Sequence, residues 1–470
     1  MKNVLTAVDA NFDHNIQQLQ EFLRQPSTSG TGVGVNRTAH LVATRLRNLG
    51  FEVTVYPTAG NPIILAKHLK ARGAAPTLLI HTSFDVMTTE GEAWWSVPPF
   101  AAEIVDHPRF GPSLVARGAF AQKTPLMVLL LTLENIESAG ELLPLNLLIL
   151  VDSEEESGSP NLPSFVQEHR RELARADGVY YPLFATDRRG TARVFLGCKG
   201  IAFLRLRCRG VSTRDLHSAE VGWIRNPAHI LAKALSSLVD IHGHPLVPGL
   251  LDEVRPPSEA DERLIHQLAE SFDPGIEALQ LDATNLSIEA DSKEEMIRRY
   301  LFLPTVNISG IQSGYVGDAV KTILPREATA HVDIRLTPDE LPRNVVQVVK
   351  DHLATLGLAD LVDVELVCML DWAKSSEDTA IGKALLKSYY DAGVDSVEIW
   401  PMLPASVPVA AYANPPLKLP FVIGGLGHGG HAHGEDEYVL VASIRSFQKG
   451  FAHFIDEFSR SRARGGGGRA

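Results

Sequence analysis

The stretch LLILVDSEEESGSPNL, residues Leu147–Leu162, decides how the first half of this chain is interpreted. Its apolar start, Leu147–Leu150, predicts a buried strand, and three consecutive acids follow at the carboxyl end of that strand: Glu154, Glu155 and Glu156. In an open α/β sheet, ligands bind in the crevice beyond the carboxyl ends of the strands. Neighbouring carboxylates repel one another unless a cation, a proton or a substrate offsets their charge. The stretch therefore indicates a functional site or, as the ordinary alternative, an acidic turn in solvent.

Length, charge and cysteine content limit the class of protein. The chain has 470 residues, too many for one hydrophobic core, so we expect two domains. A formal net charge of −12 argues against a nucleic-acid partner. The 3 cysteines have no metal-binding spacing and are typical of a reducing compartment. Because the chain lacks a signal-peptide core and any apolar run long enough to span a bilayer, we expect a cytoplasmic protein without a membrane partner.

Helix and strand patterns alternate in the first part of the chain. Apolar residues recur at helical spacing over 38–49, and the mostly apolar stretch 120–136 indicates a buried helix. Strand patterns occupy 51–56, 77–86 and 147–150. This alternation predicts an α/β fold with a mostly parallel sheet flanked by helices.

The pattern changes near residue 199. The segment IAFLRLRCRG alternates apolar and basic residues, as an antiparallel strand with one wet face does. We expect residues 199–372 to form an inserted α+β domain, so that 1–198 and 373–460 are two parts of one catalytic domain. The glycine-rich end, 461–470, predicts a disordered tail.

Several segments, taken in order, resemble one enzyme family. They are GNPIILA, FDVMTTEGEAWWSVPPF, ARGAFAQKTPL, EEESGSPNL, DLHSAEVGWIRNP, TVNISGIQSGYVGDAVKTILP, VDIRLTPDELP and HAHGEDEYV. The chain is similar to the di-zinc peptidases and amidohydrolases that include aminoacylase, carnosinase, glutamate carboxypeptidases and succinyl-diaminopimelate desuccinylase. This resemblance implies an α/β catalytic domain of the zinc-peptidase type, an inserted lid or dimerisation domain, a homodimer, and hydrolysis of peptide or N-acyl bonds.

The resemblance also implies a set of metal ligands, and three of its positions hold residues that suit a metal poorly. Ser83 stands where the family has a histidine, Ala121 replaces the bridging aspartate, and Leu183 or Pro182 stands at a later carboxylate. A zinc pair needs a bridging carboxylate and about four donors per metal. We therefore expect no zinc pair and at most one zinc.

Glu156 and His433 match the two remaining ligand positions. A single metal could be rebuilt around them with a histidine from elsewhere, either His81 or one of His428 and His431 on the glycine-rich loop. The alternatives are a core position for His81 and a purely structural loop.

Groups with catalytic roles in the family have matches here. Glu155 corresponds to the general base, and Asp85 corresponds to the aspartate that orients the first ligand. Lys123 is retained beside the altered bridging position. His217 matches a lid histidine that polarises the scissile carbonyl, often across a dimer interface. The resemblance therefore implies Glu155, His217, Asp85 and Lys123 as catalytic residues.

Three further residues match positions that hold the substrate: Asn307, Arg335 and Ser406. An arginine suits this task because its guanidinium pairs bidentately with a carboxylate, whereas the ordinary alternative is a strand-surface charge. We also place Ser83 on the substrate side, because serine is a poor metal ligand. An amino-acid-like or peptide substrate follows from the resemblance.

Three hypotheses for the function follow. The first is a metal-independent amide or acyl hydrolase with Glu155 as general acid or base. The second is a conventional dipeptidase or deacylase with one rebuilt metal. The third is a non-catalytic protein that binds ligands in the same cleft. Loss of metal ligands together with retention of Glu155, His217 and Arg335 favours the first.

Overall fold

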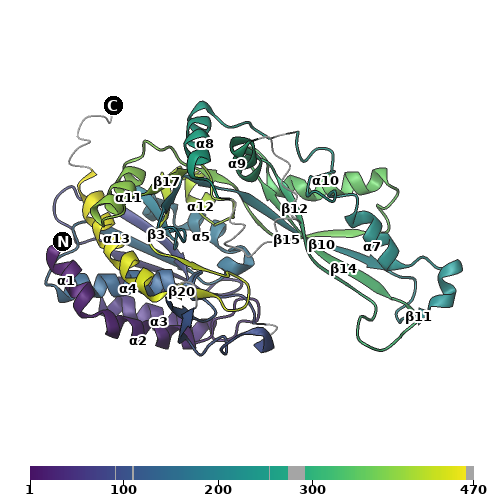
Figure 1. The fold of residues 1–470 in the computed structure, drawn as a ribbon, viewed down its shortest axis with the longest axis horizontal. Coiled ribbons are helices and arrows are strands. Elements are labelled where there is room, and N and C mark those ends of the chain that lie inside the picture. Colours follow the sequence, from purple (N-terminus) through teal and green to yellow (C-terminus); the bar gives the residue numbers. More distant parts are fainter. Residues whose placement is uncertain (90–91, 108–110, 253, 274–291, 462–470) are drawn as a thin grey trace. The chain divides into compact units, whose positions relative to one another are not determined.

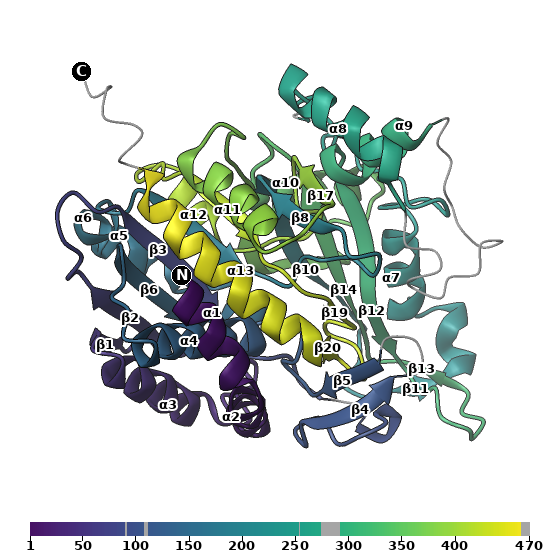
Figure 2. The ribbon, with the colours of Figure 1, turned by 60° about the vertical axis from the view of Figure 1, so that its left-hand side comes forward.

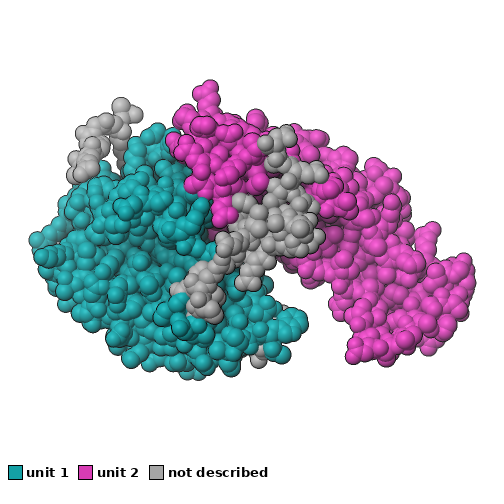
Figure 3. All heavy atoms as spheres, in the orientation of Figure 1, with its two compact units in different colours: residues 1–197, 374–400, 408–470 teal, residues 198–373, 401–407 magenta. Residues whose placement is uncertain are grey.

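The computed structural model describes residues 1–89, 92–107, 111–252, 254–273 and 292–461. Its contacts divide the chain into two compact units, which Figure 3 shows in different colours. Unit 1 comprises residues 1–197, 374–400 and 408–470, and unit 2 comprises residues 198–373 and 401–407.

Unit 1 is built on an eight-stranded mixed sheet with the strand order β1-β2-β6-β3-β7-β18-β8-β17. The central strand β3 runs parallel to β6 and β7, and every residue of β3 and β7 is buried. Burial on both faces explains why these strands have nearly continuous apolar sequences. The strands are β1 (Glu52–Tyr56), β2 (Ile63–His68), β3 (Thr77–Ser83), β6 (Asn146–Asp152), β7 (Gly178–Pro182), β8 (Ala192–Phe195), β17 (Val397–Trp400) and β18 (Phe421–Gly424).

Helices α1, α2, α4, α11 and α13 of unit 1 form a connected group (Figures 1 and 2). α13 packs on α1, α4 and α11, and α4 also packs on α2 and β3. The nearly uninterrupted apolar sequence of α4 follows from this burial, since all but three of its 16 residues are buried. The helices are α1 (Lys2–Ala10), α2 (Phe12–Arg24), α3 (Val35–Asn48), α4 (Lys123–Ser138), α5 (Leu162–Glu168), α6 (Arg170–Leu173), α11 (Ala380–Asp391), α12 (Ala410–Ala413) and α13 (Val441–Ser459).

A second, antiparallel sheet in unit 1 has the order β19-β20-β5-β4. Its strands are β4 (Glu103–His107), β5 (Gly111–Val115), β19 (Gly429–Gly430) and β20 (Tyr438–Leu440). The pairing of β20 with β5 brings the loop 431–437 beside residues 116–121, where the backbone N–H of Ala116 donates to the carbonyl of Glu437 at 3.0 Å. Two 3₁₀ turns, η1 (Glu92–Trp94) and η2 (Glu155–Ser157), complete this unit.

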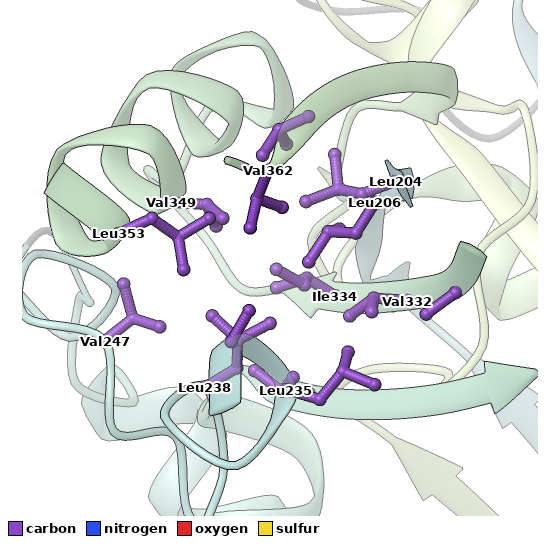
Figure 4. Packing of buried hydrophobic residues seen from close by; sticks show 14 of the residues in the cluster. Leu204, Leu206, Leu235, Leu238, Val247, Val332, Ile334, Val349, Leu353 and Val362 are labelled. Atoms are coloured by element: carbon purple, nitrogen blue, oxygen red, sulfur yellow. The ribbon is translucent and has the colours of Figure 1, made fainter. Parts of the chain in front are cut away.

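Unit 2 contains a four-stranded antiparallel sheet with the order β12-β14-β10-β15. Residues of β10 and β14 alternate strictly between a buried and a more open face, and for β10 this is the alternation that the sequence predicts. The buried face packs on α7 and α10 around residues such as Leu204, Val332 and Val349 (Figure 4). The elements are β10 (Gly200–Arg209), β11 (Leu216–His217), η3 (Ser218–Gly222), α7 (Pro227–Leu235), α8 (Glu259–Ser271), α9 (Lys293–Phe302), β12 (Thr305–Ser313), β13 (Ile323–Leu324), β14 (Glu327–Leu336), α10 (Pro342–Thr355) and β15 (Asp363–Leu370).

Short strands β9 (Gly197–Cys198) and β16 (Ala373–Lys374) mark two of the four places where the chain passes between the units. The predicted fold class, an α/β domain with an inserted α+β domain, is confirmed. Across the ranges that the structure describes, no helix is long and apolar enough to cross a membrane.

Residues 401–407 differ from the sequence prediction, which places them in the catalytic domain. They group with unit 2, because the Ser406 hydroxyl accepts a hydrogen bond from Arg335 at 2.8 Å and Leu403 accepts one from the backbone of Lys199. The predicted tail, 461–470, lies outside the described residues except for position 461.

Candidate active site

The acidic stretch lies at the carboxyl ends of the inner strands of the unit 1 sheet. β3 and β6 run parallel, and their register places Ser83 opposite Asp152 at the carboxyl ends of both strands. The turn η2, which carries Glu155 and Glu156, follows β6 at its carboxyl end. The first residue of α4, Lys123, follows Gln122, whose side chain reaches the same place.

Glu155 is held by a chain of hydrogen bonds. The Gln122 amide nitrogen Nε2 donates to Glu155 Oε2, and the Ser83 hydroxyl donates to the Gln122 oxygen Oε1. The Tyr181 hydroxyl donates to the other oxygen of Glu155 at 3.2 Å. Burial, together with the charges of Glu156 and Asp85, raises the pKa of Glu155 well above its usual value. A carboxylate fixed and tuned in this way can serve as a general base near neutral pH.

Asp85 shapes the turn rather than facing a ligand. It is fully buried, and its two carboxylate oxygens accept hydrogen bonds from the backbone N–H groups of Glu155 at 3.1 Å and Glu156 at 3.0 Å. Burial and the charge of Glu156 raise the pKa of Asp85 well above its usual value. We therefore assign Asp85 the role of positioning the backbone of this turn, whereas the resemblance implies that it orients the residue at the first ligand position.

Glu154, the first acid of the run, is also structural. Its carboxylate accepts hydrogen bonds from the backbone of Asn61 at 3.0 Å and from the side chain of Asn161 at 2.5 Å. The three acids therefore have three different environments, although the sequence presents them as equivalent neighbours.

Glu156 forms a pair with His433. His433 Nε2 lies 3.1 Å from Glu156 Oε2, and this hydrogen bond raises the pKa of His433. His433 has a φ of +66°, which is uncommon outside glycine. Both residues line a small pocket together with Ala121, Glu437 and other residues of the 117–121 segment. The pocket therefore brings together the two predicted metal ligands, Glu156 and His433, and Ala121, which stands where the family has the bridging aspartate.

Glu437 and Arg117 also line that pocket. Glu437 accepts hydrogen bonds from three backbone N–H groups, those of Gly118, Phe120 and Ala121, each at 2.9 Å. Arg117 lies 3.1 Å from the same carboxylate, and both side chains are almost fully buried. Glu437 therefore fixes the backbone of the 118–121 segment. Sequence reasoning did not identify Arg117, although it stands in the ARGA motif.

Lys123 lies in a different environment from the predicted one. Its ammonium donates to the backbone carbonyl of Gln25 and lies 4.7 Å from the ring centroid of Phe22. Burial lowers the pKa of Lys123 to about 7. These contacts tie the start of α4 to α2, so we correct the prediction that Lys123 is a catalytic residue.

The candidate replacement ligands also have structural contacts. His428 Nδ1 lies 3.0 Å from the carbonyl of Thr186 and its Nε2 lies 3.2 Å from the Tyr438 hydroxyl. The ring of His431 lies edge-on to Tyr438. His81 is fully buried, edge-on to Tyr181 and to another tyrosine, and neither ring nitrogen has a hydrogen-bond partner. The structure therefore places His81 in the core, which is the alternative to a metal-ligand role.

Burial of His81 predicts acid sensitivity. Its pKa is lowered to about 3 by burial, whereas an unfolded histidine titrates near 6.5. Below pH 6.5 the unfolded chain binds a proton at His81 that the folded chain does not. The contribution of neutral His81 to the free energy of unfolding is therefore fully present above pH 6.5 and is lost as the pH falls toward 3. At pH 5 the expected loss is about 2 kcal/mol relative to neutral pH.

Thermal unfolding of unit 1 between about pH 5 and 7 should therefore be less pH-dependent in His81→Leu than in wild type. His14→Gln, on the exposed side of α2, is the matched control and should keep the wild-type dependence. Equal pH dependence in His81→Leu and wild type would contradict this assignment.

Unit 2 carries the remaining predicted residues. Arg335 donates to Ser406 at 2.8 Å, so these two predicted substrate residues are brought together. Asn307 donates to Asp333 at 2.8 Å on the neighbouring strand. His217 lies on the short strand β11, where its Nδ1 accepts a hydrogen bond from the backbone of Ala219 at 3.1 Å. This bond leaves Nε2 as the nitrogen able to carry a proton in the neutral ring.

Comparisons with known proteins agree with this architecture. A family model described as a peptidase dimerisation domain matches residues 196–360. The Cys-Gly metallodipeptidase dug1 of Schizosaccharomyces pombe is 27% identical over 413 residues, which cover 85% of this chain and 83% of that protein. The Beta-Ala-His dipeptidase of Mus musculus is 25% identical over 96% of this chain and 94% of its own length. A solved M20 family metallo-carboxypeptidase from Sulfolobus solfataricus has a TM-score of 0.82 and 28% identity, covering 95% of this chain and 99% of its own.

Two of these relatives are named as metal-dependent enzymes, so the side chains must be compared with what a metal needs. Ala121 and Leu183 have no donor atom, and the Ser83 hydroxyl is bonded to Gln122. Within the described ranges, no group of three or more histidine, cysteine, aspartate or glutamate side chains could hold a metal ion. The residues present do not fit a zinc pair, whereas Glu156 and His433 could supply two ligands to one ion.

Proposed function

We propose that this chain, which has the M20 peptidase fold of a catalytic α/β domain and a dimerisation domain, hydrolyses the amide bond of a small peptide-like substrate. The names of the relatives, a Cys-Gly metallodipeptidase and a Beta-Ala-His dipeptidase, support a dipeptide-sized substrate. The observation that carries the proposal is Glu155, held by Gln122 and Tyr181 at the carboxyl end of a central strand.

The residues of this chain can be given roles in such a reaction. Glu155 accepts a proton from the attacking water and later donates it to the leaving amine. Arg335, oriented by Ser406, binds the carboxylate of the substrate, and Asn307 contributes to the same subsite. His217 of a second copy of the chain, as the resemblance implies, donates from Nε2 to the carbonyl oxygen as negative charge develops there. Lys123 has no role in this scheme, because its ammonium bonds to Gln25.

A second version of the function uses one metal ion. It is supported by the metal-dependent relatives and by the Glu156–His433 pair, which lies in a pocket beside Ala121. A catalytic zinc usually takes three protein ligands, so a substrate group or water would complete this site. When bound, such an ion would polarise the scissile carbonyl. The comparisons favour this version, and the missing donors at positions 83, 121 and 183 favour the metal-free one.

Metal content separates the two versions. We expect elemental analysis of protein purified without chelator to find no zinc pair and at most one ion per chain, because only two predicted ligands remain. Activity on a panel of dipeptides, N-acyl amino acids and related amides should then be measured before and after EDTA. Survival of activity supports the metal-free version, and complete loss that zinc or manganese reverses supports the one-metal version. Two tightly held ions per chain would contradict both.

A homodimer is expected through unit 2. In its four-stranded sheet, β12 and β15 are the edge strands, and Ile311 on β12 is 64% exposed. Unpaired strand edges with exposed apolar residues favour pairing with a second copy. Light scattering should give the mass of a dimer at micromolar concentration, and Ile311→Lys should shift it toward the monomer.

Val211→Lys is the control for the dimer test, since Val211 is similarly exposed outside β12. A wild-type protein that is monomeric at micromolar concentration would contradict the proposal. So would equal effects of the two lysine substitutions.

A further inference from the structure

The side chain of Gln122 links two groups that would otherwise have no common partner. Its Oε1 accepts a hydrogen bond from the Ser83 hydroxyl, and its Nε2 donates to Glu155. Ser83 lies at the end of β3, and Glu155 follows β6, so the carboxamide spans two neighbouring strand ends. Ser83 is completely buried, which leaves it little choice of partner.

A carboxamide is suited to this position by its chemistry. It offers an acceptor at one end and a donor at the other, whereas a carboxylate only accepts. Glu155 lies close to the negative charges of Glu156 and Asp85, which raise its pKa. Because like charges repel, the cluster needs a positive or donor group beside Glu155. The Gln122 N–H supplies one, and the Tyr181 hydroxyl supplies another on the opposite oxygen.

The backbone at Gln122 supports a functional role. Its φ is +60° and its ψ is −71°, a combination that residues with a Cβ rarely adopt. Strained residues of this kind persist where the surroundings over-determine them, and they gather at functional sites. The conformation turns the chain into α4 while the side chain remains directed at Ser83 and Glu155.

We propose that the Gln122 carboxamide does in this protein what a cation does in a metal-dependent site: it offsets the charge of Glu155 and holds that carboxylate in place. Ser83 anchors the carboxamide from the other side. Gln122 is thus a positioning residue, and its role in catalysis rests on the proposed function of Glu155 as the base. The linkage itself does not depend on catalysis.

The test exchanges donor and acceptor. Gln122→Glu keeps the shape and the bond from Ser83 but places a carboxylate against Glu155. We expect its melting temperature in chelator at neutral pH to fall by roughly 3–6 °C. The double variant Gln122→Glu/Glu155→Gln restores one carboxylate facing one carboxamide, with the roles reversed. It should regain most of the lost melting temperature while remaining inactive.

A divalent cation provides the second measurement. Adding excess Mn²⁺ or Zn²⁺ should raise the melting temperature of Gln122→Glu, because two facing carboxylates invite an ion, and should raise that of wild type and of the double variant much less. Gln167→Glu, an exposed position on α5, is the matched control for added charge. Should Gln122→Glu fail to fold, the double variant alone, folded and stable, still supports the linkage.

Two results would overturn the proposal. One is a Gln122→Glu variant as stable as wild type in chelator, and the other is a cation-dependent shift in wild type as large as that in Gln122→Glu. Both readouts are independent of substrate. If the double variant does not regain the lost melting temperature but Glu155→Gln still lowers turnover, only the linkage is wrong and the proposed function remains. If the double variant regains the lost melting temperature but Glu155→Gln has no effect on turnover, only the proposed function is wrong and the linkage remains.

Discussion

Replacing Glu155 by glutamine is expected to lower kcat by roughly a hundredfold or more, the usual contribution of general acid–base catalysis. Glutamine keeps the shape of the side chain, and its one oxygen can still accept the hydrogen bond from Gln122 while its NH2 group faces the Tyr181 hydroxyl, but it cannot take a proton from water. KM should change little, because Glu155 is assigned to the reacting water and not to substrate binding. Steady-state kinetics with a substrate from the dipeptide and N-acyl amino acid panel provides the measurement.

Glu154→Gln is the matched control for this substitution. Glu154 is the adjacent acid of the same run, but its carboxylate bonds to Asn61 and Asn161. We expect this control to alter stability more than turnover. Turnover of Glu155→Gln at the wild-type rate would show that the catalytic assignment is wrong. Binding of substrates without conversion by the wild-type protein would favour a non-catalytic use of the site.

The position of the site could be predicted from the sequence because it depends on topology. A buried apolar run ending in acids, within an alternating α/β pattern, places those acids at the carboxyl edge of a parallel sheet. The structure has this arrangement, with β3 and β6 parallel and Ser83 opposite Asp152. The alternation in IAFLRLRCRG likewise predicts β10, since period-two burial is a local property of the chain.

Directions of individual side chains could not be predicted in the same way. Lys123 and Gln122 are neighbours in one motif, but the turn into α4 directs the lysine to Gln25 and the glutamine to Glu155. That separation depends on a backbone conformation with positive φ at a residue that is not glycine, for which the sequence contains no signal. The partners of Asp85 could not be predicted for a related reason, because a motif does not reveal that they are backbone N–H groups.

Replacing Arg335 by methionine is expected to lower kcat/KM for a dipeptide with a free carboxylate by roughly a hundredfold, mainly through KM. Methionine keeps much of the volume but loses the charge-assisted hydrogen bonds to the carboxylate. The Ser406 hydroxyl accepts a hydrogen bond from the Arg335 guanidinium at 2.8 Å, so Ser406→Ala should cause a smaller loss of the same kind. Arg343→Met, an exposed position on α10 of the same unit, is the matched control and should behave as wild type.

Comparison of two substrates separates carboxylate binding from a structural effect. Wild type should prefer a dipeptide with a free C-terminal carboxylate over the same dipeptide with a C-terminal amide, because an amide removes the charge that Arg335 recognises. Arg335→Met should lose activity on the acid but little on the amide, so that the preference disappears. Equal losses on both substrates would mean that Arg335 supports the fold of unit 2, and an undiminished preference would place the carboxylate subsite elsewhere in the protein.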